Sequence, residues 1–86
     1  MLTISFKTTF VRQINNLEKA LAEEVLEKID LFKDLKNHKT LKVHKLHGKF
    51  AECYSFSVNY KTRIVFEYGI KNEVILLAIG DHDLYK

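Results

Sequence analysis

Acid–base chemistry is concentrated near the end of this 86-residue chain. His82 lies between Asp81 and Asp83, and Tyr85 follows two residues later. Histidine titrates near neutral pH and can serve as a general acid or base, and adjacent carboxylates favour its protonated form. The alternatives are that His82 is an ordinary surface residue and that Tyr85 packs on the fold instead of stacking on a base.

A second candidate is the arginine in the stretch TRIVFEY. Arg63 precedes an alternating pattern of apolar residues and is expected to point away from the core. A guanidinium held on a strand suits bidentate contact with phosphate. The alternative is an ion pair with Glu67, which is expected on the same face.

Positive charge is concentrated in one segment. Between Lys33 and Lys49 lie six lysines, three histidines and a single acid, Asp34. The net charge of the chain is only +3, so its distribution is more informative than its size. Such a segment favours a polyanion or an acidic partner, and the alternative is a solvated loop and strand edge.

Metal and cofactor signals are weak. His44, His47 and His82 could bind a metal, but they lack the short fixed spacing of a metal site, and we predict none. The glycines are isolated and form no phosphate-binding loop, so no cofactor is expected. Cys53 is the one cysteine, which rules out an internal disulfide, and we expect it in the core instead of at a reactive site.

Length and composition predict one small intracellular domain spanning residues 1–86. A hydrophobic fraction of 47% and the absence of proline are typical of a folded chain. The longest apolar run, residues 74–79, is far shorter than the ~20 residues that span a bilayer. We therefore expect a cytoplasmic protein that does not enter membranes.

Hydrophobic periodicity predicts a strand followed by two helices. Residues 2–6 alternate apolar and polar side chains, which is typical of a half-buried strand. A break is expected near Asn15 and Asn16, because asparagine favours turns over helix interiors, and two helices packed as a hairpin would follow. Apolar residues at three- and four-residue steps are expected to form the helical core: Phe10, Ile14, Leu17, Leu21, Val25, Ile29 and Phe32.

The second half of the chain changes to a period of two. Strands are predicted over residues 41–46, 54–60, 62–68 and 74–79, with a hairpin turn at YGIKNEV. The core-facing set includes Tyr54, Phe56, Val58 and Tyr60. The expected fold is α+β, with an N-terminal strand, a helical hairpin and an antiparallel meander, and with the helices on one face of the sheet. The other face is expected to be open and to carry Ser55, Ser57, Arg63 and Glu67, with His44, His47 and His82 nearby.

These stretches resemble the RelE/ParE superfamily of toxins from type II toxin–antitoxin pairs over essentially the whole chain. Three motifs carry the resemblance, and they are HKLHG at 44–48, TRIVFEY at 62–68 and LLAIGDHDLY at 76–85. The last motif is the most specific and is similar to the YafQ-like branch of ribosome-dependent mRNA endonucleases. The resemblance implies metal-independent cleavage, in which the ribose 2′-OH attacks the adjacent phosphate.

Site roles follow from the same resemblance. His82 matches a catalytic histidine and would be the general acid, whereas His44 would be the base or a phosphate ligand. Arg63 matches an arginine that contacts phosphate, and Tyr85 matches an aromatic residue that stacks on or orients a base. The residues expected to bind RNA are Lys42, Lys45, His47 and Lys49. The implied partners are mRNA on the ribosome and a cognate antitoxin in a hetero-oligomeric complex.

The chain also departs from its apparent relatives. YafQ-like members have a histidine near the position of Ser57 and an aspartate near that of Lys61, and RelE-like members have lysines near Ser55 and Ser57. His44, His47 or Lys49 would have to substitute for them. Two other readings stay open, a ParE-like inhibitor of DNA gyrase and a catalytically weak homologue that only binds an antitoxin.

Overall fold

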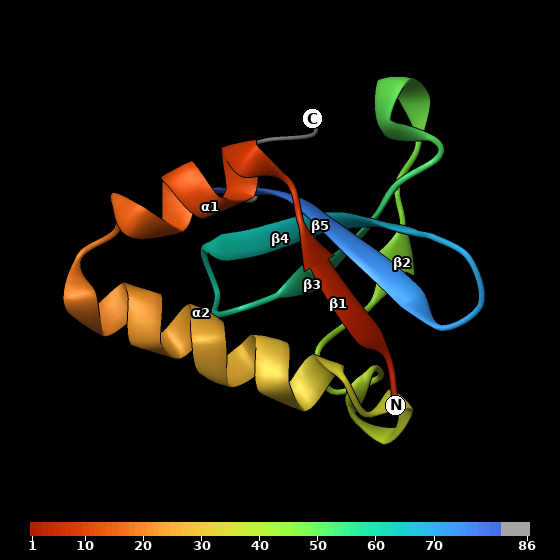
Figure 1. Cartoon of the computed structure of the whole chain (residues 1–86), viewed down its shortest axis with the longest axis horizontal. Helices are drawn as coiled ribbons and strands as arrows, with labels where there is room; N and C mark the ends of the chain where they lie inside the picture. Colours follow the sequence, from red (N-terminus) through yellow and green to blue (C-terminus); the bar gives the residue numbers. More distant parts are fainter. Residues whose placement is uncertain (82–86) are drawn as a thin grey trace.

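The computed structural model describes residues 1–81 and confirms the predicted α+β order (Figure 1). No helix within these residues is long and apolar enough to cross a membrane. The helices and strands are β1 (Thr3–Phe6), α1 (Thr8–Asn15), α2 (Lys19–Phe32), β2 (His44–Lys45), β3 (Tyr54–Ser57), β4 (Thr62–Tyr68) and β5 (Glu73–Asp81), with single 3-10 turns at Leu35–Asn37 and Gly48–Phe50.

The five strands form one mixed sheet in the order β1-β5-β4-β3-β2. Strands β2 to β5 are the predicted antiparallel meander, and β1 adds to it in parallel against β5. The first strand of the chain therefore lies beside the strand that comes last among those described. Backbone hydrogen bonds from Thr3 to Asn72 (2.8 Å) and from Lys7 to Leu76 (3.0 Å) fix both ends of this pairing.

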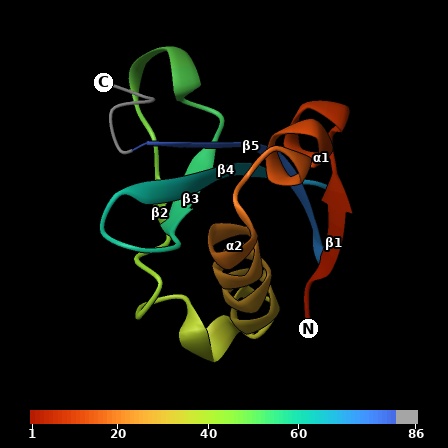
Figure 2. The same cartoon turned by 90° about the vertical axis from the view of Figure 1, so that its left-hand side faces the viewer.

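The helix break falls where the asparagines predict it. Helix α1 ends at Asn15, and the backbone N–H of Asn16 donates to the carbonyl of Gln13. Helix α2 begins at Lys19, so three residues lie between the two helices. Figure 2 shows α2 nearly end-on beside the sheet, with the turn at Gly48–Phe50 projecting away from it.

Both helices pack on one sheet face, which we call the core face. Phe32 of α2 stacks on Phe56 of β3 at 4.2 Å between ring centroids and meets Phe66 of β4 edge-on at 4.9 Å. All three rings are fully buried. Each apolar residue predicted for the helical core belongs to this cluster, either buried in it or packed against it.

An irregularity in β5 extends its contribution to the core. Val65 lies opposite Ala78 but Phe66 lies opposite Leu76, so Leu77 has no directly opposite residue on β4. A β-bulge of this kind changes the alternation of the bulged strand. Leu76 and Ile79 are consequently both buried in the core cluster although they are three positions apart, a spacing that places side chains on opposite faces of a regular strand.

Three predicted strands differ from the observed ones, and one of them is β5, which was expected over residues 74–79 and covers Glu73–Asp81. The strand expected over residues 41–46 is only His44–Lys45, because Lys42 adopts a left-handed φ of 60° and closes a turn onto the carbonyl of Lys39. The strand expected over residues 54–60 ends at Ser57, since the N–H of Val58 already donates to the carbonyl of Thr62. Tyr60, expected on the core side, is 91% exposed at this turn.

Candidate functional site

The sheet face opposite the helices, here called the site face, collects several predicted residues in two adjacent rows. In the first row His44 lies opposite Ser55, which in turn lies opposite Val65. In the second row Ser57 lies opposite Arg63. Directly opposite residues in a sheet point to the same face, so four side chains expected together do share one face.

The hydrogen bonds of His44 define its chemistry. Its Nδ1 lies 2.8 Å from the carbonyl oxygen of Lys42. A carbonyl can only accept, so Nδ1 carries the proton, and in neutral His44 the lone pair is on Nε2. Nε2 lies 3.4 Å from the hydroxyl of Ser55, a long contact. The side chain is exposed, so His44 presents a proton acceptor on the site face.

The centre of this face is closed and not open as predicted. Ser55 is fully buried and Val65 is 2% exposed. In its row Ser55 lies between His44 and Val65. Accessible chemistry is therefore confined to the margin of the face, where His44, Ser57 and Arg63 lie.

The turn between β3 and β4 anchors Arg63. Its Nη1 donates to the carbonyl oxygens of Asn59 (2.5 Å) and Thr62 (3.2 Å). Within residues 1–81 no ion pair joins it to Glu67, so that alternative is not realised. A guanidinium has further N–H groups at Nε and Nη2, which can donate to an anion while Nη1 holds the side chain in place.

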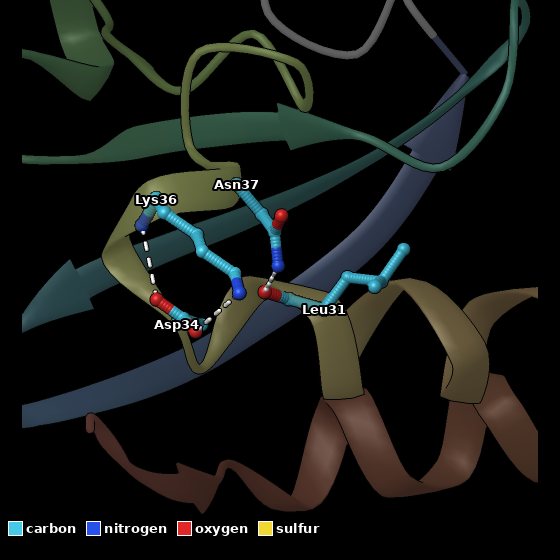
Figure 3. Close-up of polar contacts among 4 residues, drawn as sticks. All are labelled: Leu31, Asp34, Lys36 and Asn37. Atoms are coloured by element: carbon cyan, nitrogen blue, oxygen red, sulfur yellow. Dashed lines mark hydrogen bonds and ion pairs between the residues drawn. The ribbon is translucent and has the colours of Figure 1, made fainter.

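The basic segment begins in a braced turn after α2 (Figure 3). The side-chain amide of Asn37 donates to the carbonyl of Leu31 at 2.8 Å. Asp34 accepts from the backbone N–H of Lys36 at 3.1 Å and pairs with its ammonium at 3.7 Å.

His38 stacks on Phe32 at 4.6 Å, and its Nε2 donates to the Phe32 carbonyl at 2.8 Å. His38 thus supports the end of α2.

The four residues predicted to bind RNA are all exposed, but they do not share one direction. Lys45 lies opposite Tyr54, so it points to the sheet face opposite that of His44. His47 and Lys49 flank Gly48 at the projecting turn, where the Lys49 ammonium lies 5.6 Å from the Phe50 ring centroid. Lys42 lies nearer the site, because its carbonyl accepts the bond from His44.

The remaining predicted catalytic residues, His82 and Tyr85, lie outside the described residues. Asp81, which precedes His82, forms an ion pair with Lys61 at 3.9 Å. Lys61 occupies the position where the resemblance would place an aspartate. In the part of the chain that the structure describes, no group of three or more His, Cys, Asp or Glu residues could hold a metal ion.

Cys53 lies near the site face but is poorly suited to chemistry. Burial raises the pKa of its thiol, and the negative charges of Glu67 and Glu52 raise that pKa further. The thiol therefore stays protonated at neutral pH, which weakens it as a nucleophile. Cys53 is only partly buried, so it is more exposed than the core position expected for it.

Sequence reasoning missed two grooves beside the β3–β4 turn. One groove, of about 500 Å³, opens beside the second site-face row and is lined by Lys28, Leu31, Lys42, Ser57, Tyr60 and Arg63, among others. We call it the basic groove. The other, of about 610 Å³, is lined by four glutamates and two lysines among others, and is called the acidic groove: Glu18, Glu23, Glu24, Glu27, Lys28 and Lys61. The spacing of Lys28 and Leu31 on one side of α2 was the available signal for the basic groove, but without the turn beside it this spacing indicates only a helix surface.

No family model matches this chain, and no curated protein matches its sequence. Solved structures do match it. A conserved hypothetical protein from Helicobacter pylori superposes with a TM-score of 0.74 and 22% identity, covering 96% of this chain and 97% of that one. The RelE–RelB complex from Pyrococcus horikoshii gives 0.74 at 17% identity, covering 96% and 97%. YafQ from E. coli gives 0.65 at 12% identity, covering 96% of each chain. The chain therefore has the RelE/ParE-like toxin fold, as the sequence motifs predicted.

Proposed function

We propose that this chain is the toxin of a type II toxin–antitoxin pair and that it is an endoribonuclease acting on mRNA. The observation that carries the proposal is the state of His44. Its Nδ1–H donates to the Lys42 carbonyl, so Nε2 carries the lone pair of the neutral ring. His44 lies on the same sheet face as Arg63, in the neighbouring row. A base and a fixed cation on one surface are two requirements of phosphodiester cleavage.

The proposed reaction uses the nucleophile of the substrate itself. His44 Nε2 accepts the proton of a ribose 2′-OH, and that oxygen attacks the adjacent phosphorus. The bond from phosphorus to the 5′ oxygen breaks, leaving a 2′,3′-cyclic phosphate, and His82 donates a proton to the departing oxygen. Arg63 offsets the negative charge that develops on the phosphate oxygens. Tyr85 orients a neighbouring base.

An antitoxin is the proposed protein partner. Similar folds occur in toxin–antitoxin complexes from Mycobacterium tuberculosis and Staphylococcus aureus, which supports a hetero-oligomeric assembly here. The basic segment favours an acidic region of such a partner. The site of action is then the cytoplasm, where ribosome-bound mRNA is the substrate.

Inhibition of DNA gyrase is the second candidate, and Ser55, Ser57 and Lys61 favour it. They replace the lysines, histidine and aspartate implied for ribonuclease members by the resemblance, and Ser55 is fully buried. A protein described as a YoeB/ParE toxin from Agrobacterium tumefaciens also shares the fold, with a TM-score of 0.68 and 13% identity over 94% of this chain and 99% of that one. Such an inhibitor would act by binding and would not depend on His44.

The test is translation in a reconstituted bacterial extract with mRNA 5′ ends mapped by primer extension. Wild-type protein should create new ends within codons, and His44→Gln and His82→Ala should each abolish most of them. Lys19→Ala, an exposed change at the start of α2, is the matched control and should cleave as the wild type does. Intact mRNA with normal translation would contradict the proposal, and a supercoiling assay would then test gyrase inhibition.

A further inference from the structure

We propose that the basic groove is a nucleotide subsite, which holds the base and phosphate next to the bond that is cut. This inference rests on the proposed function, because it takes RNA as the substrate. It assigns binding roles to Lys28, Leu31 and Tyr60, none of which belongs to the motifs that predicted the site.

The position of the groove connects it to the site. Ser57 and Arg63 form the second site-face row and also line the groove. The first row, with His44 and Ser55, is two residues away along β3, or about 7 Å at the usual rise of a strand. An RNA strand whose phosphate contacts Arg63 therefore has the groove on one side and His44 on the other.

The charge of the groove suits a phosphodiester. Lys28, Lys42 and Arg63 line it, and none of the described residues in its lining is acidic. Lys28 has a contact with Glu27 at 3.6 Å, but the Glu27 side chain is 70% exposed, so water and salt screen that pair. Across Asn59 lies the acidic groove, where Asn59 donates to Glu24 at 2.8 Å. Four glutamates against Lys28 and Lys61 leave a net negative charge in that groove, which favours the basic side for a polyanion.

The apolar surface of the groove suits a planar base. Tyr60 is 91% exposed and Leu31 is 41% exposed, so both expose apolar area at the groove. Aromatic side chains in such positions stack on bases without strong preference for sequence. Ser57 and Thr40 add hydroxyl groups that can form hydrogen bonds with base edges. The groove therefore combines a stacking surface with cations.

Binding is tested with three probes under identical conditions by fluorescence anisotropy. The first is a labelled RNA hexamer with 2′-O-methyl sugars, which cannot be cleaved because its 2′ oxygens are blocked. The second is an abasic phosphodiester hexamer, which carries the same charge but no bases. The third is a deca-glutamate peptide, which stands for an acidic protein segment.

Tyr60→Ala should weaken binding of the RNA hexamer about tenfold and leave binding of the abasic hexamer unchanged, because it removes the ring proposed to stack on a base. Lys28→Glu should weaken the binding of both hexamers, since it removes one phosphate contact. The slope of log K against log salt concentration should become shallower by about 0.7. Lys19→Glu makes the same charge change at the start of α2 and should leave the salt slope closer to the wild-type value.

The outcomes separate this inference from the proposed function. If both groove variants bind the RNA hexamer as the wild type does while the wild type still cleaves mRNA, the subsite is wrong and the proposed function stands. If Tyr60→Ala lowers the affinity for the peptide more than the affinity for the RNA hexamer, the groove is a protein-binding surface and the subsite proposal is again wrong. If the RNA losses occur as expected but the wild type never cleaves mRNA, the groove binds RNA and the nuclease proposal fails.

Discussion

The same strands supply buried aromatic residues to one face of the sheet and polar site residues to the other. On the core face, Phe56 and Phe66 are fully buried against Phe32 of α2. On the site face, Ser55 and Arg63 come from those same strands, one residue before Phe56 and three residues before Phe66. Ser55 and Arg63 are therefore held by core neighbours in their own strands. The site needs little hydrophobic packing of its own, which leaves its residue types free for chemistry.

The largest expected effect comes from a substitution in the core face. Phe56→Ala removes a fully buried ring from the aromatic stack and should lower the free energy of unfolding by about 3–5 kcal/mol. Urea denaturation monitored by circular dichroism measures it. Phe6→Ala, at a side chain that is 50% exposed, is the matched control and should cost about 1 kcal/mol or less. A loss below 1 kcal/mol for Phe56→Ala would mean that this stack does not hold the strands.

The next effect contrasts two histidines of the basic segment. His44→Gln should lower mRNA cleavage about 100-fold, equivalent to about 2.7 kcal/mol, with unfolding unchanged within about 0.5 kcal/mol. His38→Ala should do the reverse, because His38 packs on Phe32 and bonds to its carbonyl. It should cost about 1–2 kcal/mol of stability and leave cleavage near the wild-type rate. Equal losses of cleavage in the two variants would remove the distinction between a catalytic and a supporting histidine.

The smallest effect concerns the thiol near the site face. Burial, followed by Glu67 and Glu52, raises the pKa of Cys53, so its alkylation by iodoacetamide should rise with pH later than that of an unstructured peptide thiol. Glu67→Gln removes one negative charge, lowers that pKa and should speed alkylation at a fixed pH near 8. The pH–rate profiles of the two proteins measure the shift. A profile that moves to higher pH in Glu67→Gln would have the wrong sign.

The sequence predicted the core face well because hydrophobic periodicity records burial directly. The helical residues from Phe10 to Phe32, the break at Asn15 and Asn16 and the meander order all follow from local pattern. Tyr60 was misplaced because a period of two cannot show where pairing stops. That boundary is set by a backbone bond from Val58 to Thr62 across the turn.

The site face was predictable only in part. Alternation placed Ser57 and Arg63 on one face with His44 expected nearby, and the strand register confirms that these three residues share that face. Alternation could not predict that Ser55 is buried, because it indicates the sheet face on which a side chain lies and not what covers that face. The basic groove is formed by α2, the loop after it and the β3–β4 turn. Local sequence patterns do not show which distant segments pack side by side, so the groove could not be predicted.

The parallel pairing of β1 with β5 has a consequence for how the chain folds. Residues 3–6 have no strand partner until residues 73–81 exist, and β5 is also the partner of β4. Contacts so distant in sequence close late, because a long loop must be ordered before they form. During synthesis the helices and the β2–β4 segment can collapse, but the sheet cannot be completed until β5 is made. The site face, which β2 to β4 carry, therefore lies in a complete sheet only after residue 81 has been synthesised.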